Sequence, residues 1–144
     1  MAWPGPSAIY LVRHAEKAEG KDPDLTPQGR VRARDIAAIL HRAGVSAIFC
    51  TPTVRAKQTA APLAQRTGVS VHLYDPLAPL ALVDTVRGQT GAVVVIGHSN
   101  TLPELVRLFG GTPGTEILED EFDRLYQLLP GPDGQVNTIL LGTP

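Results

Sequence analysis

Short apolar runs alternate with longer amphipathic stretches along this chain. Residues 8–12, 47–50, 69–74 and 92–96 are rich in apolar and β-branched side chains, which is typical of strands buried in a sheet. The stretches between them have helical periodicity, and this succession favours an α/β domain with a largely parallel sheet. The run at residues 92–96 is apolar throughout. We therefore expect it at the centre of the sheet, where both faces are covered.

A threonine and a proline open the first expected helix. Thr26 is suited to the N-cap position, and Pro27 fits the first helical position, where no backbone donor is needed. Gly44 is placed to end this helix after residue 43. The periodicity predicts a buried stripe of four apolar side chains: Val31, Ile36, Ile39 and Leu40.

Three further helices are expected. One follows Thr53 and stops at Gly68, and a weakly periodic segment at residues 80–87 predicts another. The last begins at Thr101 and closes near Gly110. Each of these helices follows one of the expected strands, as in a parallel sheet with helical crossovers.

The C-terminal part of the chain predicts a hairpin. Residues 124–129 and 137–141 are apolar runs that flank a Gly-Pro-Asp-Gly turn, which indicates two antiparallel strands at a sheet edge. We therefore expect one domain over residues 1–144. Its expected architecture is a three-layer α/β/α sandwich with a mostly parallel sheet and an antiparallel edge.

The composition excludes several classes of protein. Thirteen basic and 14 acidic side chains give a net charge of -1, and aromatic residues make up 5% of the chain, so nucleic-acid binding is not expected. The single cysteine, Cys50, rules out an internal disulfide framework. No apolar run reaches the roughly 18 residues of a membrane span, and residues 1–6 lack the features of a secretory signal. The expected location is the cytoplasm.

Polar residues gather where the expected strands end. Arg13 and His14 follow the first strand, Arg55 lies soon after the second, Asp75 follows the third and His98 follows the fourth. Ligands of open α/β sheets bind at this edge. Any one of these residues alone is compatible with a structural role. Two guanidinium groups and a helix N-terminus meeting at one point form a phosphate site, and two imidazoles beside it suggest phosphoryl transfer.

Four segments resemble the histidine phosphatase superfamily, which includes the cofactor-dependent phosphoglycerate mutases. Residues 11–16 (LVRHAE) are similar to its Arg-His-Gly signature, with Ala15 in place of the more common glycine. Residues 25–29 (LTPQG) are similar to its Leu-Thr-x-x-Gly segment. Residues 51–60 (TPTVRAKQTA) and 95–100 (VIGHSN) are similar to its Ser-Pro-x-x-Arg-x-x-Gln-Thr-Ala and Gly-His segments.

The resemblance implies a role for each matched residue. His14 is the expected nucleophile, which becomes phosphohistidine, and Arg13, Arg55 and His98 are expected to hold the phosphoryl oxygens. Asn100 either adds a contact to the phosphate or only opens a helix. The resemblance implies no metal or other cofactor. It is strongest to the small bacterial branch that contains protein-phosphohistidine phosphatases, so the expected partner is a phosphorylated small molecule or a phosphohistidine protein.

The chain departs from the family at the proton donor. The mutase branch has a glutamate soon after its third strand, whereas residues 77–83 contain none. Asp75 is the candidate acid, the alternative being that Asp75 and Pro76 only start a turn. Glu16 is the competing acid, unless it is simply a loop charge. Lys17 is expected either to attract an anionic substrate or to be an ordinary exposed side chain.

Three alternatives to a phosphatase remain open from the sequence. One is a phosphotransferase of the phosphoglycerate mutase kind, and another is a binding module that holds phosphate without turnover. A metallohydrolase with His14 and His98 as ligands is the third, although the flanking arginines argue against it because they repel a cation. The sequence does not predict the oligomeric state.

Overall fold

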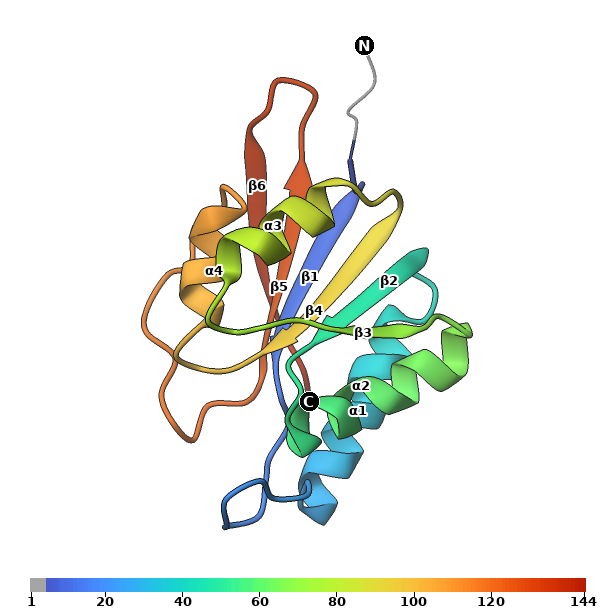
Figure 1. Cartoon of the computed structure of the whole chain (residues 1–144), viewed down its shortest axis with the longest axis vertical. Helices are drawn as coiled ribbons and strands as arrows, with labels where there is room; N and C mark the ends of the chain where they lie inside the picture. The colour runs from blue at the N-terminus through green and yellow to red at the C-terminus, as the bar shows by residue number, and fades with distance from the viewer. Residues whose placement is uncertain (1–4) are drawn as a thin grey trace.

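A computed structural model describes residues 5–144. The first four residues, including Trp3, lie outside the described residues, and with them lies most of the N-terminal segment 1–6 that is expected to lack a secretory signal. The described part forms one six-stranded sheet with helices on both faces (Figure 1). The strands are β1 (Ala8–Arg13), β2 (Val45–Cys50), β3 (Val71–Leu73), β4 (Ala92–Gly97), β5 (Arg124–Pro130) and β6 (Val136–Gly142). The helices are α1 (Pro27–Leu40), α2 (Val54–Thr67), α3 (Pro79–Arg87) and α4 (Leu102–Leu108).

The order of strands across the sheet is β3-β2-β4-β1-β5-β6. The first four are parallel, and β5 and β6 are antiparallel, as the Gly-Pro-Asp-Gly turn predicts. Strand β4 lies between β2 and β1 and is buried along its whole length, which confirms the expectation from its apolar sequence. The ends of β1 and β4 are therefore neighbours, with Arg13 opposite Gly97.

Alternate side chains of the strands enter two separate cores. Tyr10 and Val12 of β1 lie in the core beneath α1 and α2, whereas Ile9 and Leu11 lie in the core beneath α3 and α4. This alternation follows from the two-residue period of a strand. The expected three-layer α/β/α sandwich with an antiparallel edge is confirmed (Figure 1).

The buried face of α1 differs from the predicted stripe. Val31 and Ile39 are 48% and 43% exposed, so only two of the four predicted positions, Ile36 and Leu40, are buried. The helix packs instead through small residues, because α2 lies close against it. Hydropathy periodicity gives little weight to such residues. The buried positions of α1 are Gly29, Ala33, Ile36, Ala37 and Leu40.

Three elements are shorter than their apolar runs suggest. Helix α1 ends at Leu40, and α4 ends at Leu108. Strand β3 covers only Val71–Leu73, because it is an edge strand whose pairing with β2 continues for few residues. In the described part of the chain, no helix is long and apolar enough to cross a membrane.

Candidate active site

A cleft of about 450 Å³ opens at the carboxyl ends of β1 and β4. One side is formed by residues that follow these strands and by the first turn of α2. The opposite wall is the connection between α4 and β5. The lining residues are Arg13, His14, Lys17, Arg55, His98, Ser99, Asn100, Glu116, Ile117, Leu118 and Glu119.

His14 is held in one orientation and one tautomer. It is 3% exposed, and its Nδ1 lies 2.8 Å from the carbonyl oxygen of Ala15. Because a carbonyl oxygen only accepts, Nδ1 must carry the proton and Nε2 keeps its lone pair. The pKa of His14 is lowered to about 3, chiefly by burial, with the neighbouring His98, Arg13 and Arg55 adding to the shift. The ring is therefore neutral at physiological pH and has a free nucleophilic nitrogen.

His98 lies beside His14, with 5.1 Å between the ring centroids. Its Nε2 is 2.7 Å from Thr51 Oγ1, so the residue that follows β2 orients the imidazole that follows β4. Burial lowers the pKa of His98 to about 4, with Arg55 and Arg13 adding to the shift. His98 is thus also neutral in the free protein.

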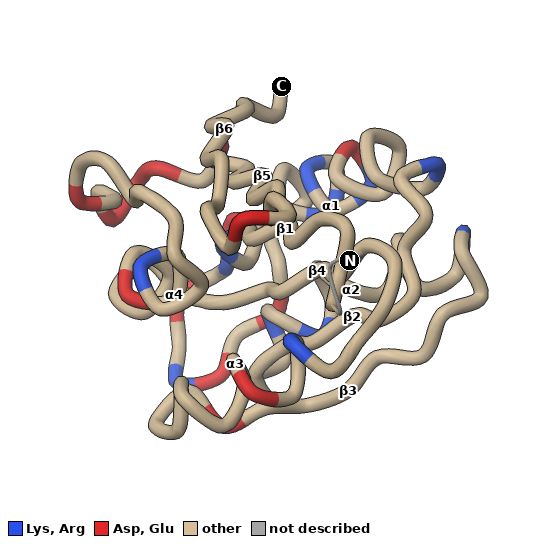
Figure 2. The backbone as a smooth tube through the Cα atoms, turned by 90° about the horizontal axis from the view of Figure 1, so that it is seen from above, with Lys and Arg blue, Asp and Glu red and all other residues tan. Residues whose placement is uncertain are grey.

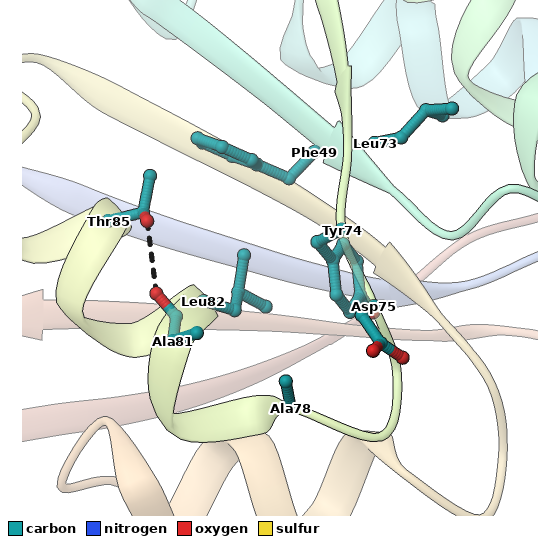
Figure 3. A pocket seen from close by; sticks show the side chains of 8 residues that line it. All are labelled: Phe49, Leu73, Tyr74, Asp75, Ala78, Ala81, Leu82 and Thr85. Carbon is teal, nitrogen blue, oxygen red and sulfur yellow. Dashed lines mark hydrogen bonds between the residues drawn. The ribbon is translucent and has the colours of Figure 1, made fainter.

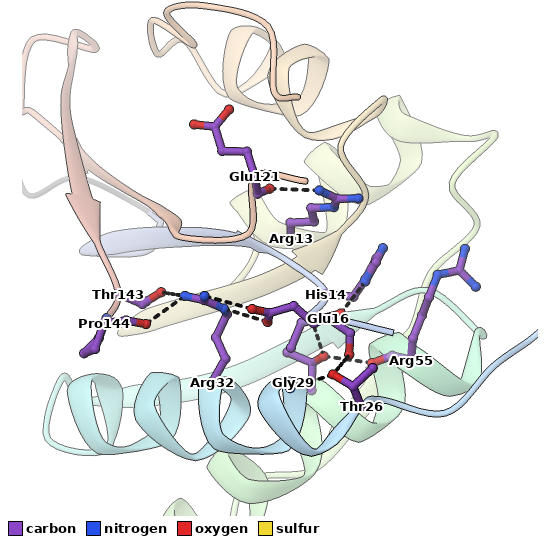
Figure 4. A network of polar contacts seen from close by, with 12 residues as sticks. Arg13, His14, Glu16, Thr26, Gly29, Arg32, Arg55, Glu121, Thr143 and Pro144 are labelled. Carbon is purple, nitrogen blue, oxygen red and sulfur yellow. Dashed lines mark hydrogen bonds and ion pairs between the residues drawn. The ribbon is translucent and has the colours of Figure 1, made fainter. Parts of the chain in front are cut away.

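Arg13 supports the opposite wall of the cleft. It is 5% exposed, and its guanidinium carbon lies 3.9 Å from the centre of the Phe122 ring, a cation–π contact. The hydrogen bond to the Glu121 carbonyl is visible in Figure 4. In all, Nη1 donates to three backbone carbonyls: Leu118 at 3.2 Å, Glu119 at 2.7 Å and Glu121 at 2.8 Å.

Arg55 is less constrained than Arg13. It lies in the first turn of α2, and its nearest acidic partner is Asp22, at 3.8 Å between Nη1 and Oδ1. The same Asp22 oxygen accepts the backbone N–H of Val54, so a carboxylate occupies the N-terminal end of α2. An anion in the cleft would lie close to these donors.

Within residues 5–144, the buried Nε–H groups of Arg13 and Arg55 have no hydrogen-bond acceptor. Buried donors are rarely left unpaired in native proteins, and such exceptions require an explanation. Both residues line the cleft, so an oxyanion bound there would supply acceptors for guanidinium donors. This pair of donors indicates a ligand with tetrahedral or planar oxygen groups.

The loop after His14 is anchored on α1. The carbonyl of Glu16 accepts the backbone N–H of Thr26 at 2.9 Å, and the Thr26 hydroxyl accepts from Gly29, as an N-cap should. A Cβ on Gly29 would lie 2.1 Å from the same carbonyl oxygen, so only glycine fits there. These contacts explain physically why the segment has threonine and glycine three residues apart (Figure 4).

Thr59 connects the nucleophile loop to α2. Its buried hydroxyl accepts the backbone N–H of Ala15 at 2.9 Å and donates to the carbonyl of Arg55 at 2.8 Å. Thr59 therefore fixes the two segments that present His14 and Arg55. Sequence reasoning gave this residue no role, although it lies within the Gln-Thr-Ala part of the resemblance.

The two candidate acids lie in different surroundings. Asp75 is exposed and is not among the residues lining the cleft; its carboxylate accepts the N–H of Leu77 at 2.8 Å, as in an Asx turn. It borders a separate hollow beside Tyr74 (Figure 3). Glu16 is bound by both ends of the Arg32 guanidinium, at 2.7 and 2.9 Å. Burial alone would raise the pKa of Glu16, but the bonds from Arg32 outweigh it and the net shift is downward.

The cleft is also lined by other residues, some of which were expected from the sequence and some of which were not. Asn100 and Lys17 line the cleft, as the sequence allowed. Glu116 and Glu119 also line it, and sequence reasoning missed them because they lie in a connection without periodicity. The acidic residues concentrated at 116–123 were the sequence feature that could have indicated them. Among the described residues, no group of three or more His, Cys, Asp or Glu side chains is arranged to hold a metal ion.

The fold and the cleft define a class of protein: an α/β domain whose sheet carries, at its carboxyl edge, a cleft lined by two arginines and two neutral imidazoles. The family model of the histidine phosphatase superfamily (branch 1) matches residues 9–84, more than half of the chain. The chain belongs to this superfamily. No curated protein matches it.

Solved structures of the same fold cover nearly the whole chain. The protein histidine phosphatase SixA complexed with tungstate has a TM-score of 0.73 at 19% identity, covering 94% of this chain and 96% of that chain. A phosphohistidine phosphatase SixA described for Agrobacterium tumefaciens has a TM-score of 0.70 at 21% identity, covering 94% and 97%. The mycobacterial glucosyl-3-phosphoglycerate phosphatase Rv2419c has a TM-score of 0.68 at 15% identity, covering 93% and 96%.

Proposed function

We propose that this protein is a phosphatase that hydrolyses its substrate through a covalent phosphohistidine on His14. The observation that carries the proposal is the fixed tautomer of His14. Its Nδ1–H is engaged by the Ala15 carbonyl, which leaves Nε2 as the nucleophile of a ring that lines the cleft with Arg13, Arg55 and His98. Family membership supports the same activity.

In the first step, the guanidinium groups of Arg13 and Arg55 hold the phosphoryl oxygens. His14 Nε2 forms a bond to phosphorus while the bond from phosphorus to the leaving group breaks, and the leaving group takes up a proton. In the second step, water attacks phosphorus, the N–P bond breaks and Nε2 regains its lone pair. The proton from water passes to the phosphate product or to solvent. Charge on the equatorial oxygens is stabilised by preorganised donors throughout.

His98 becomes a stronger donor when the substrate binds. In the free protein its pKa is lowered to about 4, chiefly by burial and then by the two arginines. A phosphate dianion between the arginines neutralises their charge and favours protonation of the imidazole. His98 then donates to the developing negative charge, while Thr51 keeps the ring in place.

We further propose protein phosphohistidine as the substrate class. Asp75 does not line the cleft and Glu16 is bound by Arg32, so an alkoxide in the cleft depends for its proton on a movement of Asp75 or on Glu116 or Glu119 of the cleft wall. An imidazole leaving group needs less help than an alkoxide, because it is protonated by solvent near neutral pH. The similarity to a protein histidine phosphatase supports this class. Asp75 as general acid stays a prediction, as does the phosphate contact of Asn100.

The test is to trap the intermediate. The protein is mixed with a radiolabelled phosphohistidine protein or an aryl phosphate and quenched in alkali, where phosphohistidine survives. We expect label on His14 and none on a His14→Asn variant. Turnover without label on His14 would contradict the proposal. Transfer of the label to an added alcohol in preference to water would indicate a phosphotransferase, and binding without turnover would indicate a phosphate-binding module.

A further inference from the structure

The net charge of -1 conceals a separation of charge between the two helical layers. Residues 26–68, which contain α1 and α2, have seven Lys or Arg and one Asp or Glu. Residues 75–123, which contain α3, α4 and the wall of the cleft, have eight Asp or Glu and two Lys or Arg. Figure 2 shows basic positions along α1 and acidic positions around α3 and α4. The two faces of the sheet are therefore oppositely charged.

The basic layer contains a groove between α1 and α2. Two hollows, of about 170 and 360 Å³, share Arg34, Pro62 and Gln65, so they form one continuous depression. Arg30 lines one end of the groove and Arg66 the other. The remaining lining includes alanines, whose short side chains allow another polypeptide to approach closely.

The three arginines of the groove are available for a ligand. Arg30, Arg34 and Arg66 are exposed, and among the described residues none of them has a side-chain hydrogen bond or an ion pair. Arg32, which lies on another side of the same helix, is fully engaged by Glu16 and Thr143. Within residues 5–144, the groove arginines therefore make no polar side-chain contact.

We propose that this groove docks an acidic, extended segment of a partner protein. Arg30 and Arg34 are four residues apart on α1, about 6 Å along its axis. Alternate side chains of an extended peptide project from one face at intervals of about 6.6 Å. An acid-x-acid sequence therefore matches the arginine spacing, and each guanidinium can bind a carboxylate with two parallel hydrogen bonds.

Two features favour a peptide over other anionic partners. The groove is lined by no aromatic side chain among the described residues, so it offers nothing on which nucleic-acid bases stack. It is a recess between helices, whereas lipid headgroups present a broad surface. Gln58 lines the end nearer the cleft, less than one helical turn after Arg55, so a docked partner lies beside the cleft. The docking itself does not depend on hydrolysis.

The experiment measures binding of a fluorescein-labelled Gly-Glu-Gly-Glu-Gly-Glu-Gly peptide by fluorescence anisotropy at low salt. The groove variant is Arg30→Gln with Arg34→Gln, the pair whose spacing the peptide matches. The control variant, Arg42→Gln with Arg107→Gln, removes the same charge outside the groove. Because exposed ion pairs are individually weak, we expect Kd to rise about fivefold in the groove variant and less than about twofold in the control. Melting temperatures verify that both variants fold.

Several results would overturn the proposal. Equal weakening in both variants would mean that the peptide senses only the overall charge. Failure of the peptide to bind, with groove-dependent binding of a single-stranded oligonucleotide or of anionic lipid vesicles, would assign the groove to another partner. A concentration-dependent dimer that the groove variant abolishes would mean that a second copy of the chain fills it. None of these readouts involves turnover, so they are independent of the proposed phosphatase activity.

Discussion

Residues that follow β1, β2 and β4 contribute to one cleft, whereas the residues that follow β3 do not. His14 and His98 follow neighbouring strands, and their rings are 5.1 Å apart. Asp75 follows β3, which is three strand spacings from β1, or about 14 Å. Its carboxylate closes its own turn. A shared sheet edge is therefore not enough to bring residues together: the order of strands decides which of them meet.

The largest expected effect is at the end of β1. His14→Ala removes the only atom proposed to bond to phosphorus, so hydrolysis of every phosphate substrate should fall by more than about a thousandfold. The matched control is His72→Ala, because His72 is exposed on β3 and does not line the cleft. Initial rates with an aryl phosphate check both variants. Near-normal activity of His14→Ala would end the phosphohistidine mechanism.

Substitutions of the two cleft arginines, Arg13 and Arg55, are expected to differ in their effect on stability. Arg55→Ala removes a donor that we propose acts on the transition state, and it should cost on the order of 3 kcal/mol, about a hundredfold in kcat/KM, with little change in Tm. Arg13→Ala should lower Tm as well, since it leaves three backbone carbonyls of the cleft wall without their donor. Similar thermal melts for the two variants would contradict this distinction, and a change confined to KM would make Arg55 a ground-state binder.

Much of the fold follows from local patterns in the sequence. The apolar run of β4 predicts a central strand, and Gly68, with a φ of 74°, ends α2 where the sequence suggests. The Gly-Pro-Asp-Gly turn predicts the antiparallel edge. These features depend on nearby residues only. The predicted buried stripe of α1 was wrong at Val31 and Ile39, because burial of this helix depends on how closely α2 packs against it.

In the candidate site, too, features that depend on nearby residues could be predicted, and contacts between distant segments could not. Arg13, His14, Arg55 and His98 lie in one cleft, and the sequence predicted their placement at or soon after strand ends. Thr51 and Thr59 were not given roles, because their contacts join segments that are 47 and 44 residues apart in the chain. The charge separation was present in the sequence but is lost in a single net charge. Counting charges by segment would have found it.

The histidines at the ends of β1 and β4 should make stability depend on pH. Their pKa values are lowered to about 3 and about 4, below the ordinary 6.5, so the unfolded chain binds more protons as the pH falls. Their stabilising contribution is complete above pH 6.5 and is lost as the pH falls toward 4 and 3. The free energy of unfolding should decrease by up to about 1.4 kcal/mol per pH unit for each histidine.

Urea unfolding of the wild type and of a His14→Asn, His98→Asn double variant, measured from pH 7 to pH 4, checks this. Subtracting the two curves removes the contribution of the carboxylates, which titrate in both proteins. A wild-type curve parallel to that of the double variant would mean that neither imidazole is held neutral by the fold. In the wild type, kcat/KM should persist well below pH 6.5, because His14 remains unprotonated.

The smallest expected effect is at the end of β3, where Asp75→Asn tests whether position after a strand is sufficient for catalysis. Asparagine also accepts the N–H of Leu77, so the turn should survive and stability should change by less than about 0.5 kcal/mol. If Asp75 only closes its turn, kcat for alkyl phosphates, aryl phosphates and phosphohistidine should all stay near wild type. If it is the general acid, alkyl phosphates should slow by about 10²–10⁴-fold while aryl phosphates and phosphohistidine change little, since an alkoxide needs the proton most. Glu119→Gln is the matched comparison, because Glu119 carries the same group on the wall of the cleft. A selective loss on alkyl phosphates in Glu119→Gln, and not in Asp75→Asn, would assign the proton donor to the wall of the cleft rather than to the strand end.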